Sequence, residues 1–511
     1  MNTICSDLKN PFGFVSCEEE EKVLQDMYSD FFFWETPFND PTLDKDTYLV
    51  IGRRGSGKTS LTRFFNFQDT YKNACCIDVD EPAEYEQVLT EVSIASGSTT
   101  EYAISKLVSI WEHVIWCIIF DELKDVSLTI KKAAFIRNKK TSFARLIRDV
   151  LSGILNKITS SSKTSSSLEN YLESETFLDA KNEALEYLQK NPLFVAIDSL
   201  ERYDVQNEPL MEATAALIEA AKKFNLRYSN KNLFIKVFIS AEIFPYISEQ
   251  YIDNSLKYIS QAVYLHWRPR DLVRFISWRL YKHVESLGRQ IPSHILTLDW
   301  EDFDQVFKMV WLPYFGDTLL SREKLSERIF PYILRHTQMR PRQLVVLCNA
   351  IAKQAASAIP SADPSKIIPL AIHNNERNLA TEVINSYSKV YENVGTIITA
   401  LSGEPMIFSG KHLDKVAPKT ASAWTEEYSP LRFRQLVAEL GVVGKIRSGN
   451  EKTRIISADF EYNKDDRLTI NDTTNCVVHP MFYRKLSINT EAKWIVYPFP
   501  DHDDYKIIHG N

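Results

Sequence analysis

The sequence lacks the features that mark several large classes of protein. Its seven cysteines show no spacing typical of metal ligands and no histidine pair accompanies them, so we expect a reduced, cytosolic setting and no cysteine metal site. Its most apolar stretch, residues 114–120, is far too short to cross a bilayer, and its first residues lack the basic-then-apolar pattern of a secretory signal. We therefore expect a cytoplasmic protein without a membrane segment.

The chain also lacks an excess of positive charge. Its formal net charge is −7 over 511 residues, so no overall field draws it to nucleic acid or to an anionic membrane, and any contact with DNA must be local. Its apolar and charged fractions are those of an ordinary folded protein. A chain of this length predicts about three domains.

The first distinctive feature that is present is a glycine-rich loop. Residues 48–51 form a short apolar run of strand-forming residues, and a helical pattern of apolar residues follows the loop. The loop fills the template G-x-x-x-x-G-K-[S/T], which requires a strand before it and a helix after it. The alternative is a glycine turn that caps an ordinary helix. The loop and helix start consist of Gly52, Arg53, Arg54, Gly55, Ser56, Gly57, Lys58, Thr59 and Ser60.

The chemistry of this loop points to ATP and Mg²⁺. Glycines allow the backbone to curl so that several N–H groups face a phosphate chain, and the start of the following helix adds partial positive charge. Lys58 is placed to reach the β- and γ-phosphates, and the hydroxyl of Thr59 is placed to ligate Mg²⁺. We therefore expect residues 52–60 to bind the nucleotide.

Apolar runs and helical patterns alternate through the first half of the chain. This alternation predicts an α/β fold with a doubly wound, mostly parallel sheet. Residues 159–167 are almost all serine and threonine, a composition that cannot bury a core, so we expect an exposed and mobile insertion there. The expected strands are residues 74–79, 193–197, 233–239 and 263–265, and the expected helices are residues 100–122, 128–157, 178–190 and 209–224.

Polar side chains follow two of these strands. Asp198 is our candidate for organising Mg²⁺, because a buried parallel strand that ends in an acid delivers a carboxylate to this edge; the alternative is a helix cap. Glu201 is the candidate base that orients the attacking water, with Asp204 in reserve, although a solvated acid is equally compatible. Ser240 would hydrogen-bond the γ-phosphate or the water, or would simply cap its strand.

The sequence after the sheet is expected to be helical and contains an arginine motif. Arg340 and Arg342 flank Pro341, and a proline in the first turn of a helix aims such a side chain away from the helix start. Either arginine is a candidate for such an outward-directed guanidinium, and the alternative is an ordinary surface pair. The sequence is equally compatible with Arg340 and with Arg342 in this role.

The last part of the chain mixes helices with alternating strand patterns. Helices are expected at residues 394–401 and 430–440, the second ended by Gly441. A polar basic turn at residues 445–454 and strand patterns at 455–462 and 467–470 then predict a winged helix. Acidic residues nearby bring the local charge close to neutral, so we favour protein contact over DNA contact. The basic residues that would contact DNA are Lys445, Arg447, Lys452 and Arg454.

The chain is therefore expected to fold as successive parts. The N-terminal segment contains a helix at residues 18–27 and an aromatic cluster at residues 31–34 that packs near the nucleotide, as core or against the purine. The expected parts are the N-terminal segment 1–45, the nucleotide-binding core 46–265 with its helical insertion 81–190, the helical lid 266–385 and the winged-helix-like α+β domain 386–511.

Taken together, these motifs resemble the P-loop ATPases of the AAA+/STAND group. Within it the chain is similar to a bacterial family whose architecture is like that of origin-recognition initiators, over roughly residues 10–485. The resemblance implies that Ser240 is a first sensor and Arg340 or Arg342 a second sensor of the γ-phosphate. It also implies a regulatory ATPase that acts beside a separate effector protein in bacterial defence against phage. The motifs are the loop, Asp198-x-x-Glu201, Ser240-Ala241-Glu242, the turn at 267–272, Arg340-Pro341-Arg342 and the winged helix.

Two departures from the group qualify this expectation. Ser199 follows Asp198 where a second acid is usual, which favours slow hydrolysis with Glu201 as the close acid. No arginine is clearly the one that reaches a neighbouring subunit's nucleotide, and if one does, the protein must form a homo-oligomer. The candidates are Arg202, Arg227, Arg268 and Arg270.

We therefore expect an ATP-binding and ATP-hydrolysing switch that oligomerises and controls an effector. No nucleophile elbow, zinc site or cluster of nuclease carboxylates stands out, so a destructive activity would belong to another chain. The main alternative is a DNA-binding AAA+ initiator or loader that uses the winged helix. A P-loop kinase and a scaffold with an inactive nucleotide site are further alternatives, against which the lid and the complete loop argue.

Overall fold

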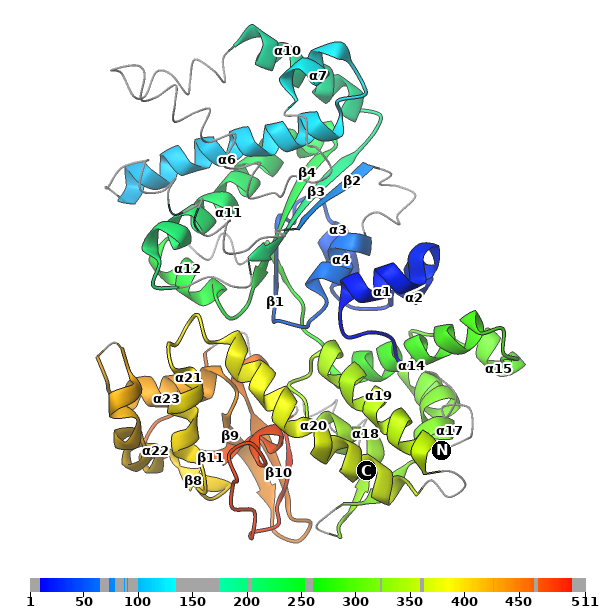
Figure 1. Cartoon of the computed structure of the whole chain (residues 1–511), viewed down its shortest axis with the longest axis vertical. Coiled ribbons are helices and arrows are strands. Elements are labelled where there is room, and N and C mark those ends of the chain that lie inside the picture. The colour runs from blue at the N-terminus through cyan, green and yellow to red at the C-terminus, as the bar shows by residue number, and fades with distance from the viewer. Residues whose placement is uncertain are drawn as a thin grey trace. The chain divides into compact units, whose positions relative to one another are not determined.

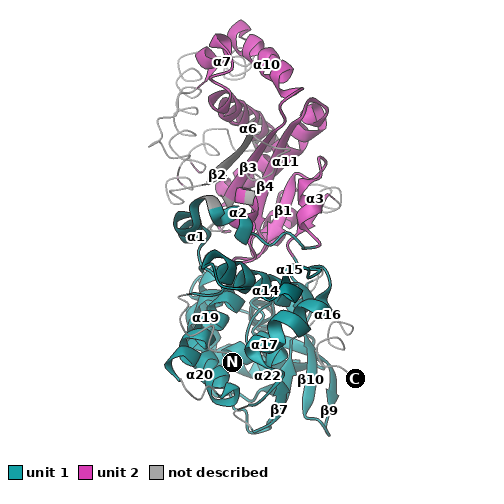
Figure 2. Cartoon of the chain, turned by 90° about the vertical axis from the view of Figure 1, so that its right-hand side faces the viewer, with its two compact units in different colours: residues 1–36, 266–511 teal, residues 37–265 magenta. Residues whose placement is uncertain are grey.

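The computed structural model divides the chain into two compact units (Figure 2). Pro37–Leu265 form the first, which we call the sheet unit. Met1–Thr36 and His266–Asn511 form the second, the composite unit, so the expected lid, the C-terminal part and most of the N-terminal segment belong together. The structure describes residues 10–64, 73–78, 87, 90, 100–134, 174–200, 205–252, 261–321, 324–358, 363–425, 427–463 and 467–498.

Several sequence predictions fall outside these described residues. They include the proposed base Glu201, its alternative Asp204, the candidate Arg202 and the serine- and threonine-rich stretch 159–167. Within the described part of the chain, no helix is both long enough and apolar enough to cross a membrane.

The sheet unit is built on five parallel strands in the spatial order β2-β3-β4-β1-β5. The apolar runs of β1, β3 and β4 are almost completely buried, as expected for parallel strands covered on both faces. This confirms the expected α/β fold with a parallel sheet. The strands are β1 (Leu49–Gly52), β2 (Asn73–Asp78), β3 (Leu193–Leu200), β4 (Leu233–Ser240) and β5 (Ala262–Tyr264).

Helices cover both faces of this sheet (Figure 1). α11 packs on β4 and α6 packs on α11, where the indole N–H of Trp111 donates to the carbonyl of Ala213 at 2.8 Å. α3 and α4 lie on the opposite face. The helices are α3 (Asn39–Leu43), α4 (Lys58–Phe64), α6 (Thr100–Glu122), α7 (Leu128–Ala133), α10 (Glu175–Leu188), α11 (Glu208–Tyr228) and α12 (Phe244–Gln250), with η5 (Ser229–Lys231).

The composite unit begins with short N-terminal helices and continues with helices that follow the sheet unit in sequence. α14 begins at Pro269, and the Asp271 carboxylate accepts the N–H of Arg268, which caps the helix. α19 and α20 pack together. The elements are α1 (Cys17–Leu24), η2 (Gln25–Met27), α2 (Tyr28–Phe31), α14 (Pro269–Ser286), α15 (Ser293–Leu296), α16 (Phe303–Val306), the π-helical η6 (Phe307–Trp311), α17 (Leu312–Phe315), β6 (Thr318–Leu320), β7 (Ser326–Arg328), α18 (Ile329–Leu334), α19 (Pro341–Ser357) and α20 (Pro364–Ser386).

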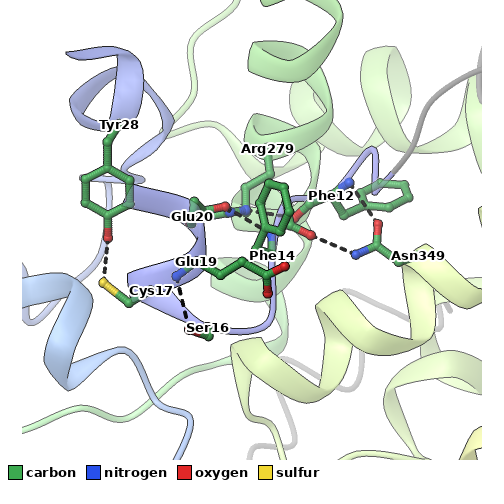
Figure 3. A network of polar contacts seen from close by, with 10 residues as sticks. Phe12, Phe14, Ser16, Cys17, Glu19, Glu20, Tyr28, Arg279 and Asn349 are labelled. Atoms are coloured by element: carbon green, nitrogen blue, oxygen red, sulfur yellow. Dashed lines mark hydrogen bonds and ion pairs between the residues drawn. The ribbon is translucent and has the colours of Figure 1, made fainter. Parts of the chain in front are cut away.

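The N-terminal segment at residues 10–20 is held by hydrogen bonds and an ion pair to α14 and α19 (Figure 3). The N–H of Phe12 donates to Asn349 Oδ1 at 3.1 Å, and Asn349 Nδ2 donates to the Gly13 carbonyl at 2.8 Å. Arg279 Nε donates to the Phe12 carbonyl at 2.8 Å, and its guanidinium pairs with the carboxylate of Glu20. The N-terminal segment and the helices that follow the sheet unit in sequence thus belong to one unit.

A mixed sheet closes the composite unit, in the spatial order β12-β10-β9-β11-β8. β9 and β10 form an antiparallel hairpin, while β12 pairs in parallel with β10. The elements are α21 (Val394–Ile398), η7 (Thr399–Leu401), β8 (Ile407–Ser409), α22 (Gly410–Val416), η8 (Ala417–Ala423), α23 (Pro430–Glu439), β9 (Val443–Asn450), β10 (Ile455–Asp459), η9 (Glu461–Asn463), β11 (Asn475–Val478), η10 (Pro480–Phe482) and β12 (Ile495–Tyr497).

Two sequence predictions for this hairpin are wrong. Residues 445–454 were expected to be a turn, but residues 445–450 belong to β9 and the turn covers only 451–454. Residues 467–470 were expected to be the second strand, but β10 is the partner of β9 and residues 467–470 form no strand. The expected helix ended by Gly441 is confirmed, since α23 ends at Glu439 and Gly441 has φ of 64°.

Candidate functional site

The glycine-rich loop connects the end of β1 with the start of α4. Gly55 and Gly57 have φ of 82° and 102°, a region that side chains with a Cβ rarely adopt. A Cβ on Gly52 would lie 2.5 Å from Ser56 Oγ, so the loop folds tightly back over its own beginning. The N–H of Ser56 donates to the Arg53 carbonyl at 3.0 Å. The sequence template therefore corresponds to a real curl of the backbone at the carboxyl edge of the sheet.

The lysine of the loop lies inside this curl. Lys58 is 3 % exposed, and its Nζ donates to the carbonyls of Gly52 at 2.9 Å and Arg53 at 3.3 Å. A buried ammonium of this kind is held by carbonyl oxygens and is ready to exchange them for a stronger anionic acceptor. Lys58 is therefore placed to compensate negative charge bound in the loop.

The hydroxyl of Thr59 meets the carboxylate of Asp198. Thr59 Oγ1 donates to Asp198 Oδ2 at 2.7 Å, although the two residues are 139 positions apart in sequence. Asp198 is 3 % exposed and lies near the end of β3, which α4 contacts. Hydroxyl and carboxylate oxygens are suitable ligands for Mg²⁺. The structure thus joins the two residues that the sequence proposed as metal ligands.

The side chains that the structure describes do not by themselves complete a metal site here. Among the described residues, no group of three or more histidine, cysteine, aspartate or glutamate residues is placed to hold a metal ion. Mg²⁺ commonly takes one or two protein ligands and fills its remaining positions with water and substrate phosphates. Thr59 and Asp198 fit that pattern when a phosphate chain is bound in the loop.

The end of β4 lies directly beside the loop. Ser240 pairs in register with Gly52 of β1 and is 3 % exposed. Its hydroxyl donates to Glu242 Oε2 at 2.5 Å, and Glu242 Oε1 accepts the backbone N–H of Arg54 at 3.2 Å. Sequence reasoning gave Glu242 no role. Its only signal was an acid two residues beyond the end of a buried strand.

A buried lysine fixes the chain just before β1. Lys236 lies in the middle of β4, and its Nζ donates to the carbonyls of Asp44 at 2.6 Å and Thr47 at 2.8 Å. Burial lowers the pKa of Lys236 from 10.5 to about 7, opposed by the nearby carboxylates of Asp44 and Asp46. The entry into β1, and through it the start of the loop, is therefore held by a side chain from the neighbouring strand.

The candidate sensor arginines are engaged within the composite unit. Arg340 caps α19, is 3 % exposed, and its Nη2 donates to Gln338 Oε1 at 2.9 Å. Arg342 Nη1 lies 3.5 Å from Glu382 Oε1 on α20. Arg340 is therefore buried, whereas Arg342 is the half-buried member of the motif.

Of the other candidate arginines that the structure describes, Arg227 and Arg270 lie on helices and Arg268 caps one. Arg227 Nη1 on α11 pairs with Glu112 Oε2 on α6 at 3.0 Å, so it holds two helices of the sheet unit together. Arg268 is the exposed cap of α14, and Arg270 lies in the first turn of that helix.

The basic side chains of the hairpin are exposed but not all are free of intramolecular contacts. Arg447 pairs with Asp459 across the two strands, and Arg454 Nη1 donates to the Ala492 carbonyl at 3.1 Å. Lys445 and Lys452 are exposed at the base and the tip of the hairpin. The hairpin therefore carries four exposed basic residues, and one of them, Arg447, is paired with an acid.

The geometry as a whole combines a curled loop, a buried lysine and a hydroxyl–carboxylate pair at one edge of a parallel sheet. Such edges are where open α/β sheets bind ligands, and these groups suit a phosphate chain with a divalent cation. Neither the comparison with models of known protein families nor the search of curated proteins finds a match to this chain.

Proposed function

We propose that residues 52–60 bind ATP together with Mg²⁺ and that the chain hydrolyses the nucleotide slowly. The observation that carries this proposal is the hydrogen bond between Thr59 and Asp198 beside the curled loop. Two residues so distant in sequence that meet at the loop with Mg²⁺-ligand chemistry are difficult to explain by a helix cap alone. Bound Mg²⁺ would neutralise charge between the phosphates.

The roles of the protein groups follow from their positions. Lys58 would leave the Gly52 and Arg53 carbonyls and pair with the phosphates, while the N–H groups of the curl would hold their oxygens. Thr59 and Asp198 would hold the metal ion, Asp198 through a water. Glu201 is the proposed base, and Ser199 in place of a second acid is the reason to expect slow turnover.

We further propose that the sheet unit is a P-loop ATPase core of the AAA+/STAND kind. The position of β4 between β1 and β3 supports this proposal, because it puts Ser240 beside the loop. The hairpin of β9 and β10, preceded by α23, supports a winged-helix-like C-terminal part. The resemblance of the motifs to the AAA+/STAND group implies that the protein is a homo-oligomeric switch that controls an effector protein in bacterial defence.

ATP turnover by the purified chain tests the proposal. Lys58→Ala is expected to lose ATP binding and turnover, whereas Lys132→Ala, at an exposed lysine on α7 of the same unit, is expected to match the wild type. Glu201→Gln is expected to bind ATP without turning it over. Turnover per chain that rises with protein concentration would support the homo-oligomer. ATP binding that survives Lys58→Ala would contradict the assignment of the loop.

A DNA-binding initiator is the second candidate, because the exposed hairpin carries Lys445 and Lys452. Its affinity for duplex DNA would fall steeply with salt concentration. The pairing of Arg447 with Asp459 weakens this candidate, because the carboxylate neutralises one of the four positive charges of the hairpin. Turnover measured with and without duplex DNA decides between the two: stimulation that disappears in Lys445→Ala/Lys452→Ala would favour the initiator.

A further inference from the structure

Glu242 contacts the glycine-rich loop although nothing so far gives it a function. It lies two residues beyond the end of β4 and is 4 % exposed. Its Oε1 accepts the backbone N–H of Arg54 at 3.2 Å, and its Oε2 accepts the hydroxyl of Ser240 at 2.5 Å. The carboxylate is therefore fixed at both oxygens, by the loop on one side and by the strand end on the other.

This contact places an anionic acceptor on a donor of the loop. Backbone N–H groups in a curled, glycine-rich loop are the donors that such loops offer to phosphate oxygens. A carboxylate oxygen and a phosphate oxygen are both charged acceptors, and a single N–H makes a strong hydrogen bond to one of them at a time. Glu242 and an incoming phosphate group therefore compete for the N–H of Arg54.

The hydroxyl of Ser240 is subject to the same competition. A serine hydroxyl has one proton to donate, and in the structure that proton goes to Glu242 Oε2. The N–H of Glu242 donates back to Ser240 Oγ at 3.3 Å. Ser240 can therefore donate to a γ-phosphate only after Glu242 has released it.

We propose that Glu242 is an internal competitor of the terminal phosphate and sets the preference of the loop between ATP and ADP. The inference rests on the proposed function of residues 52–60 as an ATP site. Without a γ-phosphate, Glu242 holds Arg54 of the loop and Ser240 of β4. ATP brings a further anion to the loop, displaces the carboxylate and frees the Ser240 hydroxyl, whereas ADP leaves Glu242 in place.

Glu242→Gln in the full-length chain tests this inference. The substitution keeps the size of the side chain and removes its charge. The Kd values of Mg²⁺-ADP and of Mg²⁺ with the non-hydrolysable analogue β,γ-imido-ATP are measured by calorimetry. The ratio of the two affinities is expected to shift toward the triphosphate by about tenfold or more, because the substitution removes a negative charge that repels the third phosphate at close range. Glu186→Gln, at an exposed glutamate on α10, is the matched control and is expected to keep the wild-type ratio.

A second variant and a second readout separate this role from others. Glu242→Ala removes the competitor completely and is expected to shift the ratio in the same direction, so the test survives if Glu242→Gln fails to fold. ATP turnover is measured on the same samples. Wild-type affinity ratios in both variants would overturn the inference while the proposed function stands. If the ratios were unchanged and turnover were lost, Glu242 would instead act as a general base that activates the attacking water. Absence of nucleotide binding in the wild type would overturn the proposed function and this inference together.

Discussion

Asp198 receives a hydrogen bond from a residue that lies 139 positions earlier in the chain. At the scale of single residues, this pair makes the sharpest prediction about metal use. Asp198→Asn keeps the shape of the side chain but removes the charge that would attract Mg²⁺, so ATP affinity in the presence of Mg²⁺ is expected to fall about 10- to 100-fold. ATP affinity measured with a chelator should hardly change.

The matched control for this prediction is Asp179→Asn, at an exposed aspartate on α10. It should bind ATP like the wild type with and without Mg²⁺. An equal loss of affinity for Asp198→Asn under both conditions would show that Asp198 supports the loop without organising a metal ion.

Lys236 predicts a pH dependence of folding stability. Its pKa is lowered from 10.5 to about 7 by burial, so between these pH values the unfolded chain holds a proton that the folded chain lacks. The free energy of unfolding therefore rises with pH in this window, by up to about 1.4 kcal/mol per pH unit. Below about pH 7 the folded chain also carries the charge on Lys236, so the contribution of Lys236 to the free energy of unfolding no longer varies with pH and is unfavourable.

Lys236→Met removes this dependence, and urea unfolding between pH 6.5 and 10 measures it. The difference in unfolding free energy between the wild type and Lys236→Met is expected to move in favour of the wild type as the pH rises. Lys231→Met, at an exposed lysine just before β4, should give a difference that does not vary with pH. A constant difference for Lys236→Met as well would contradict the lowered pKa.

The sequence predicts most residues of the candidate site, but it presents Glu242 only as the last residue of the motif Ser240-Ala241-Glu242 and gives it no role, for a physical reason. The loop is a local pattern of eight residues, and Asp198 and Ser240 each end a recognisable apolar run. Glu242 lies beyond its strand, and its partner Arg54 is 188 positions away. No sequence pattern predicts the contact between Glu242 and Arg54, because the contact forms only when β4 pairs with β1.

At the scale of elements, the hairpin of β9 and β10 shows why some strands are not visible in a sequence. The first two residues of β9 are buried, but Lys445 and residues 447–450 are exposed. A strand that extends into solvent carries polar residues on both faces and therefore has no period-two pattern. The sequence therefore predicts a polar turn at residues 445–454, where the structure has most of β9. It also places the second strand of the hairpin at residues 467–470, whereas β10 is the second strand.

Gly441 provides a test at the scale of elements, because it follows the end of α23 and lies close to Gln338, which precedes α19. It has φ of 64°, and a Cβ there would lie 2.7 Å from Gln338 Nε2 and 2.8 Å from the ring of Tyr462. Gln338 Nε2 donates to the Leu440 carbonyl at 2.8 Å, so it is not free to move away. Gly441→Ala is expected to lower the free energy of unfolding by about 1–3 kcal/mol.

Gly449→Ala in the same hairpin is the control for that prediction. A Cβ at Gly449 would meet only Ile456 Cγ1 at 3.8 Å, an ordinary contact, and alanine suits an exposed strand position. Chemical unfolding followed by circular dichroism should therefore leave Gly449→Ala close to the wild type. Equal losses in the two variants would mean that the close approach at Gly441 carries no special cost.

At the scale of the whole molecule, the chain begins in one unit, passes through the other and returns. The sequence predicted the second boundary, at residues 265 and 266, because the pattern changes there from strands to helices. It did not predict that residues 10–36 belong with the helices that follow the sheet. That assignment depends on Arg279 and Asn349, which contact the N-terminal segment from more than 250 positions away.

The buried pair of Glu20 and Arg279 makes this assignment testable. Glu20 is 4 % exposed and Arg279 7 %, and burial lowers the pKa of Arg279 to about 10. Glu20→Gln leaves the guanidinium buried without its carboxylate, which is expected to cost about 3–5 kcal/mol. Glu20→Gln/Arg279→Met is expected to recover part of the loss, since the uncompensated charge is then gone. Glu19→Gln, one position away and exposed, should have little effect.

Hydrogen exchange followed by mass spectrometry locates the effect in the molecule. Because the pair belongs to the composite unit, Glu20→Gln should accelerate exchange in α1, α14 and α19, which its network joins, and leave β1, β3 and β4 protected as in the wild type. Faster exchange in the sheet unit alone would contradict the division of the chain. Unchanged exchange everywhere would show that the ion pair of Glu20 and Arg279 contributes nothing to the stability of α14.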